Sequence, residues 1–134
     1  MVRKLKTRVI SRPLYINYLK RAEECLDAAR NSFNSKKWNA ATINAVHSCI
    51  AACDAMCVYF LGKRYAGGSH DEAVTLFKTI KSSQEMDINA NRIARIVRIK
   101  NMAEYEERLV SKYEAERILR DCERLFEYIK GELP

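Results

Sequence analysis

The stretch from Trp38 to Leu61 constrains the fold more than any other part of the sequence, because it is apolar on nearly every side of a helix. A helix of this kind is stable in water only when several neighbouring elements cover it. Gly62 follows directly and is a typical residue at the C-terminal end of a helix. The stretch contains no run of 18 uninterrupted apolar residues, so we expect no membrane span. It predicts a central helix around which the rest of the chain packs.

Four further segments carry the apolar spacing or the capping signals of helices. They cover residues 13–34, 69–80, 88–106 and 111–130, and Gly131 is expected to close the last one. Serines in S-x-x-E motifs, at positions 69 and 111, predict capping boxes for the third and fifth helices. Four Gly and two Pro in 134 residues argue against a turn-rich β-sandwich, and no long stretch alternates with period two. The fold class predicted is all-α, a single-domain antiparallel bundle of four to five helices.

The positive charge of the chain is concentrated at its start. The formal net charge is +7, and residues 1–12 contain five cations and no acid. We therefore divide the chain into a basic N-terminal arm, residues 1–12, and a helical domain, residues 13–134. Two interpretations of the arm stay open: a flexible tether to RNA or a partner, or a solvated and unordered start.

The five cysteines, an odd number with no C-x-x-C pair, are interpreted as packing residues. Cys49, Cys53 and Cys57 recur every fourth residue, and such a ladder rises about 12 Å over eight residues, too long for one metal ion. Free cysteine also behaves as a small buried hydrophobe. We predict no metal site and no cofactor, and the free thiols fit a reducing cytoplasm.

Polar residues on the apolar central helix form the first candidate site. Asn44, His47 and Asp54 fall within one stripe of that helix. A buried Asp needs a partner, because an unpaired charge in a core is costly. Asp54 therefore either caps a neighbouring backbone or pairs with an Arg of the fourth helix, or else it belongs to a ligand site.

The fourth predicted helix carries the second candidate site. Its first sixteen residues contain no acid, and a basic face extends toward an aromatic ring. This face comprises Arg92, Arg95, Arg98, Lys100, Asn101 and Tyr105. Cations for the phosphate backbone and a ring for stacking are what RNA or phosphate recognition requires, although a solvated helix has the same appearance. The acids Glu104, Glu106 and Glu107 adjoin it, so the mixed charge could equally pair two subunits.

Several short motifs, taken in their order along the chain, resemble the HEPN superfamily. They are N-A-V-H (44–47), D-A-M (54–56), F-L-G-K-R (60–64), G-S-H-D-E-A (68–73), K-N-M-A-E-Y-E (100–106) and the last predicted helix from residue 111 to 126. The resemblance covers most of the chain from about residue 15. It implies a bundle of four or five helices that dimerises.

The resemblance also implies a set of possible activities. Many HEPN proteins are metal-independent ribonucleases, some are toxins paired with a minimal nucleotidyltransferase, and others are non-catalytic nucleotide- or RNA-binding modules. The nucleases carry R-x(4–6)-H on the fourth helix. Arg98 matches the Arg and Tyr105 the following Tyr, but the His position falls on Ala103. Arg64 and His70 have R-x(5)-H spacing across a Gly-Gly loop, which we interpret as coincidence.

Our first hypothesis is a non-catalytic, cytoplasmic homodimer that binds RNA or a nucleotide and pairs with a nucleotidyltransferase. The alternative is a metal-independent ribonuclease toxin in which Arg98 acts with His47 as a substitute base. A third possibility is a structural bundle whose charges only keep it in solution. The chain has no G-x-S-x-G, no His-Glu-x-x-His and no Gly-rich phosphate loop, which argues against other common enzyme classes.

Overall fold

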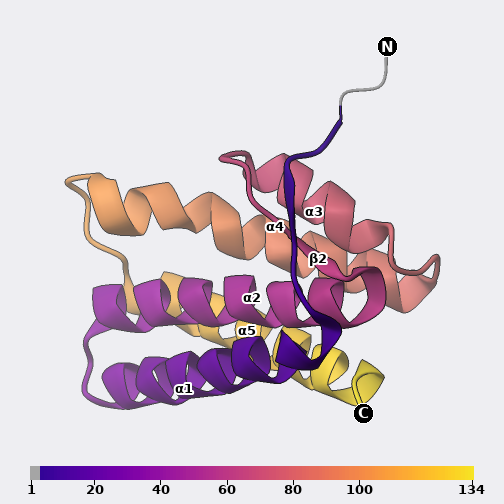
Figure 1. Cartoon of the computed structure of the whole chain (residues 1–134). Helices are drawn as coiled ribbons and strands as arrows, with labels where there is room; N and C mark the ends of the chain where they lie inside the picture. Colours follow the sequence, from indigo (N-terminus) through magenta and orange to yellow (C-terminus); the bar gives the residue numbers. More distant parts are fainter. Residues whose placement is uncertain (1–3) are drawn as a thin grey trace.

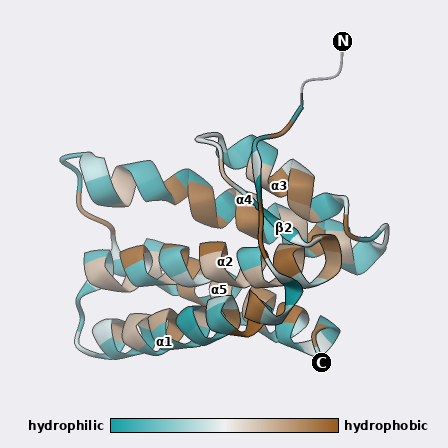
Figure 2. Ribbon diagram, viewed as in Figure 1, coloured by the Kyte–Doolittle hydropathy of each residue, from teal (hydrophilic) through white to brown (hydrophobic). Residues whose placement is uncertain are grey.

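The computed structural model describes residues 4–134 and confirms the all-α bundle. Within these residues there are five α-helices: α1 (Tyr15–Asn34), α2 (Trp38–Leu61), α3 (His70–Lys78), α4 (Gln84–Tyr105) and α5 (Lys112–Glu132). Helices α1, α2 and α5 pack together, and α4 lies across α2 and α5 with α3 packed on it (Figure 1). Along α3 and α4, hydrophobic segments alternate with hydrophilic ones, as expected for helices with one buried face (Figure 2).

Helix α2 is the centre of the bundle, as its sequence predicts. It contacts α1, α4 and α5, and twelve of its residues are buried. By length and composition α2 is the one helix among residues 4–134 that could span a membrane. Its buried residues form the core together with the apolar faces of its neighbours.

Serine caps fix the starts of three helices. Ser111 forms the predicted capping box with Glu114 at α5. At α3 the Ser69 hydroxyl accepts from the Glu72 amide, but the Ser69 amide donates to the Tyr65 hydroxyl, so the capping box predicted there is not completed. The sequence analysis missed Ser83, whose hydroxyl accepts from the Met86 amide at 3.0 Å. Helix α4 therefore begins at Gln84 rather than at residue 88. Helix α5 continues through Gly131 to Glu132, so the prediction that this glycine closes the helix is wrong.

The prediction of an unordered N-terminal arm is wrong for the segment that follows residue 6. Strand β1 (Thr7–Val9) pairs antiparallel with β2 (Lys63–Tyr65), with Arg8 opposite Arg64. A short 3-10 turn, Arg12–Leu14, then leads into α1. The Arg12 guanidinium lies over the Tyr59 ring, 4.6 Å from its centroid, and its Nε donates to the Tyr59 carbonyl at 2.6 Å. Backbone pairing, which side-chain periodicity does not reveal, holds this segment against the end of α2; residues 1–3 of the predicted arm lie outside the described residues.

Candidate nucleic-acid interface

The basic face predicted on the fourth helix does not form one surface in the structure. Arg95 and Arg98 line a groove between α4 and α5. Lys100, Asn101 and Tyr105 line a different cavity, between α4, α2 and the loop that follows β2. Arg92 lines neither of them, and its Nη1 donates to Asn89 on its own helix at 2.9 Å. A helix that projects its side chains in all directions divides such a row between its two neighbours.

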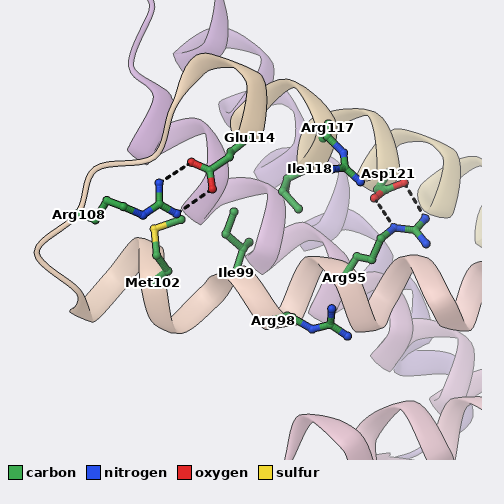
Figure 3. A pocket seen from close by; sticks show the side chains of 9 residues that line it. All are labelled: Arg95, Arg98, Ile99, Met102, Arg108, Glu114, Arg117, Ile118 and Asp121. Carbon is green, nitrogen blue, oxygen red and sulfur yellow. Dashed lines mark hydrogen bonds and ion pairs between the residues drawn. The ribbon is translucent and has the colours of Figure 1, made fainter.

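The groove between α4 and α5 has a volume of about 340 Å³. Figure 3 shows guanidinium groups from both helices and from their connecting loop around an apolar centre. The lining residues are Arg95, Arg98, Ile99, Met102, Arg108, Glu114, Arg117, Ile118 and Asp121. Arg117 also reaches a smaller neighbouring hollow, which is lined by Arg95, Arg120, Asp121 and Arg124 as well. Cations of α5 thus extend the surface that the sequence analysis assigned to α4 alone.

Acids from α5 neutralise two of the arginines in this groove. The Nε and Nη2 atoms of Arg95 donate to the two carboxylate oxygens of Asp121, at 3.0 and 3.1 Å. Arg108 binds Glu114 in the same manner, at 2.9 and 2.8 Å. The hydrogen bonds from Arg108, with those of Ser111, lower the pKa of Glu114 to about 2. These pairs are fixed structural contacts, so their cations are only partly available to an anionic ligand.

The remaining arginines of this surface have no acidic partner among the described residues. They are Arg98, Arg117 and Arg124, while Arg120 pairs with Glu116 one turn away at 3.1 Å. The sequence did contain a signal for the α5 contribution, because residues 117, 120 and 124 have helical i, i+3, i+7 spacing. The acids interspersed along the same helix obscured it. We call this surface, Arg95, Arg98, Arg117, Arg120 and Arg124, the α4–α5 arginine surface.

The polar stripe predicted on α2 separates into three environments. Asn44 Nδ2 donates to the Ala40 carbonyl of its own helix at 2.9 Å. His47 is exposed, and its Nε2 lies 3.5 Å from Glu104 Oε1 on α4. Neither of the two cavities on either side of α4 is lined by both His47 and Arg98.

Within residues 4–134, Asp54, the third member of that stripe, forms neither a backbone cap nor an ion pair with an Arg of α4, so both of those predictions are wrong. It lies in the cavity between α2 and α4. Burial raises its pKa to about 6, against the opposing effect of Arg64 and, less strongly, of Arg21. Its cationic neighbours therefore come from β2 and α1 and not, as predicted, from α4.

The same cavity brings together residues that the sequence analysis set aside. Arg64, at the middle of β2, and His70, the first residue of α3, both line it. Their R-x(5)-H spacing, which we interpreted as coincidence, therefore places a guanidinium group and an imidazole ring at one cavity across the Gly67-Gly68 loop. That loop folds tightly, because a Cβ at Gly67 would overlap the Tyr65 hydroxyl.

The family model of the HEPN domain matches residues 15–132, nearly the whole helical region. The chain belongs to the HEPN domain family. A search of curated proteins found no match to it. In this HEPN domain the position expected for the nuclease His is the half-buried Ala103 on α4, one residue before Glu104.

Proposed function

We propose that this HEPN domain binds RNA without cleaving it, through the α4–α5 arginine surface. The observation that supports the proposal is that Arg98, Arg117 and Arg124 share one surface and have no acidic partner within residues 4–134. Guanidinium groups that are not neutralised release counterions when they bind phosphates, and this supplies most of the affinity for a nucleic-acid backbone. The exposed ring of Tyr113, in the first turn of α5, offers a stacking surface for an unpaired base.

Two features favour binding over cleavage. Ala103 stands where the family resemblance predicts the His that handles protons in the nuclease members. The candidate substitute, His47, lies beside the Glu104 carboxylate rather than beside Arg98. A metal-independent ribonuclease would need an acid–base group within hydrogen-bond reach of the phosphate that its Arg holds.

The test is binding of a labelled single-stranded oligoribonucleotide, measured by fluorescence anisotropy over a series of salt concentrations. The affinity should fall steeply as the salt concentration rises. Arg98→Ala and Arg117→Ala should each reduce the slope of log affinity against log salt concentration by about one. The matched control is Lys20→Ala, which removes one exposed cation from α1. Equal losses in all three variants would contradict a specific surface, and absence of binding at low salt would overturn the proposal.

The same protein samples distinguish RNA binding from the ribonuclease alternative. Incubated with RNA in EDTA, the wild-type protein should leave the RNA intact. Cleavage that Arg98→Ala or His47→Ala abolishes would replace the binding proposal with the nuclease one.

The proposed function includes a homodimer. Tyr105 and Leu109, which are 76% and 73% exposed, lie at the end of α4 and in the loop that follows it. The acids Glu104, Glu106 and Glu107 adjoin the arginines of α4. In a dimer, the exposed apolar side chains of the two copies can therefore pack together, and the acids of one copy can face the cations of the other. Sedimentation equilibrium at micromolar concentration should show a dimer, and Leu109→Glu should give a monomer. A wild-type monomer would exclude this part of the proposal.

Two further parts of the proposal concern the cellular setting. Cys25, Cys49, Cys53, Cys57 and Cys122 are all free thiols, and this is consistent with a reducing compartment such as the cytoplasm. We also include the predicted minimal nucleotidyltransferase partner, which rests on the family membership alone. Co-expression with such a protein from the same genomic neighbourhood, followed by purification, tests it: a stable complex is expected, and separate elution would contradict it.

A further inference from the structure

Strand β1 has one edge that no other strand covers. The sheet consists of β1 and β2 alone within residues 4–134, so β1 is paired on one side only. Strand β2 packs against α2 and α3, whereas β1 lies beside it at the outside of the molecule (Figure 1). An open strand edge presents unpaired N–H and C=O groups and is a template for a further strand.

The hydrogen bonds to the β2 side identify which backbone groups of β1 face the open edge. The Lys6 carbonyl accepts from that side at 2.9 Å, and the Ile10 amide donates to it at 3.0 Å. Bonded and non-bonded residues alternate along an antiparallel strand, so Lys6, Arg8 and Ile10 face β2, and Thr7 and Val9 face away from it. No turn or loop hydrogen bond reaches Thr7 or Val9 within residues 4–134. Their amides and carbonyls are therefore available to a new strand.

The exposed face of β1 is basic. Lys4, Lys6 and Arg8 are exposed, whereas Leu5 between them packs against the core. Because side chains alternate between the two faces of a strand, the three cations share one face. Arg64 of β2 stands directly opposite Arg8, and such a pairing of like charges is unfavourable. The face therefore gains from any acidic group that approaches it.

The charge of this face selects the kind of partner. Residues 4–12 and 62–68, which include both strands, contain no acid. A second copy of the chain would add its own Lys6 and Arg8 to the same face, and cations on an edge strand oppose such self-pairing. A polypeptide with acids at alternate positions would instead bring carboxylates to the cations. The phosphates of a nucleic acid offer only acceptors, so they leave the carbonyls of the edge without donors.

We propose that β1 docks an acidic, extended segment of a partner protein as a third strand of the sheet. The backbone of the segment bonds to Thr7 and Val9, and its acidic side chains face Lys6 and Arg8. In strand addition of this kind, backbone bonds supply affinity and alternate side chains supply specificity. The Val9 side chain, which is 83% exposed, offers an apolar contact on the opposite face. None of these residues belongs to the α4–α5 arginine surface, so the proposal does not depend on RNA binding.

The test is titration of the isotope-labelled protein with a synthetic peptide of alternating Glu and Thr, about eight residues long. Binding should slow amide hydrogen exchange at Thr7 and Val9, because both amides become hydrogen-bonded. The control is a peptide of alternating Glu and Pro with the same charge. Its prolines occupy the positions whose amides would face β1, so it should bind about tenfold more weakly or less.

Three outcomes would overturn the proposal. Equal affinities for the two peptides would show that charge alone drives binding. Slow exchange at Thr7 and Val9 in the concentrated protein by itself would assign the open edge to a second copy of the chain. Protection of the same two amides by a single-stranded oligoribonucleotide, but not by the Glu–Thr peptide, would assign it to RNA.

A proline variant tests the backbone contact. Val9→Pro removes one amide from the open edge and leaves the hydrogen bonds to β2 in place. It should weaken binding of the Glu–Thr peptide about tenfold. Val9→Ala keeps the amide and should bind almost as tightly as the wild type. Equal losses in the two variants would mean that the Val9 side chain, rather than the strand edge, holds the peptide.

A charge variant tests the side-chain contact. Arg8→Glu should weaken the Glu–Thr peptide about tenfold, because it places like charges together. The new carboxylate faces Arg64, so β1 should stay paired with β2, and exchange of the Ala66 amide should be unchanged or slower. Lys20→Ala, which removes an exposed cation of α1, is the control and should not alter peptide binding. Peptide binding by Arg8→Glu as tight as by the wild type would contradict an acidic partner.

Discussion

Arg95 of α4 and Asp121 of α5 face each other through two parallel N–H···O bonds of 3.0 and 3.1 Å. The Asp121 side chain is only 14% exposed, whereas that of Arg95 is 40% exposed. The carboxylate therefore depends on the guanidinium for its hydrogen bonds, and the guanidinium still reaches solvent. This pair both joins the two helices and sets how much positive charge their shared surface presents.

Removing the arginine from this pair should destabilise the fold. Arg95→Ala leaves a largely buried carboxylate without its partner, and we expect a loss of about 1 to 2 kcal/mol in the free energy of unfolding by urea. The matched control is Arg120→Ala, which breaks an exposed pair with Glu116 on one helix. That variant should cost about 0.5 kcal/mol or less. Equal effects would show that the α4–α5 pair is no more than a surface contact.

Neutralising the acid of the pair should strengthen RNA binding. Asp121→Asn removes a negative charge beside Arg117 and Arg124, so the affinity for single-stranded RNA should rise about two- to fivefold at low salt. The gain should shrink at high salt, because screening weakens the interaction. Anisotropy titrations at two salt concentrations measure both effects. An unchanged affinity would contradict a phosphate-binding role for this surface.

The pKa of Asp54 predicts that protein stability falls with rising pH. The folded-state pKa is about 6 against an ordinary value of 3.8, so the folded protein binds this proton more tightly than the unfolded chain does. This contribution to stability is complete at pH below about 3.8 and is lost as the pH rises through about 6. Arg64 and Arg21 reduce the loss, because both stabilise the ionised form.

Asp54→Asn should therefore be more stable than the wild type above pH 6. The expected gain is about 3 kcal/mol, since the pKa rises from 3.8 to about 6 and each pKa unit corresponds to roughly 1.4 kcal/mol. Thermal unfolding at pH 4.5 and 7.5 measures this gain. The control is Asp27→Asn, which replaces an exposed acid of α1 and should change the stability little. A less stable Asp54→Asn at pH 7.5 would mean that the carboxylate has a stabilising partner in the folded state.

Two glycines allow a matched test of backbone strain. Gly62 ends α2 with φ of 69°, in the left-handed region, whereas Gly131 lies within α5; a Cβ on either would meet no atom within 4 Å. Gly62→Ala should destabilise by about 1 kcal/mol, because alanine resists positive φ. Gly131→Ala should stabilise by about 0.5 kcal/mol or more, because alanine favours the helix. Chemical denaturation of both variants measures the opposite signs.

The pairing of β1 with β2 predicts a specific effect of proline. Arg8→Pro removes the amide of the residue opposite Arg64, in the middle of the ladder. The Ala66 amide, which donates to the Lys6 carbonyl at 2.9 Å, should then exchange its hydrogen faster. Arg8→Ala keeps the backbone donor and should leave that exchange unchanged. If both variants accelerate exchange equally, the side chain rather than the ladder holds the strand.

Much of the fold could be predicted from the sequence because helices record their neighbours in side-chain periodicity. Trp38–Leu61 is apolar on nearly every side, which predicted a central helix, and Ser69 and Ser111 predicted the starts of two further helices. The resemblance of the motifs to HEPN proteins is confirmed by the family match. Strand β1 could not be predicted in this manner, because three residues paired through their backbone leave no periodic signal.

The site depended on the tertiary structure for a different reason. The sequence by itself determined which side chains are available: a helix with Arg95 and Arg98 and no nearby acid, and an apolar helix with one Asp. Only the packing of α5 against α4 decided that Asp121 neutralises Arg95, and only the course of β2 brought Arg64 to the cavity of Asp54. Charge acts through space, so the partner of each ionised group is set by the packing of helices and not by its distance along the chain.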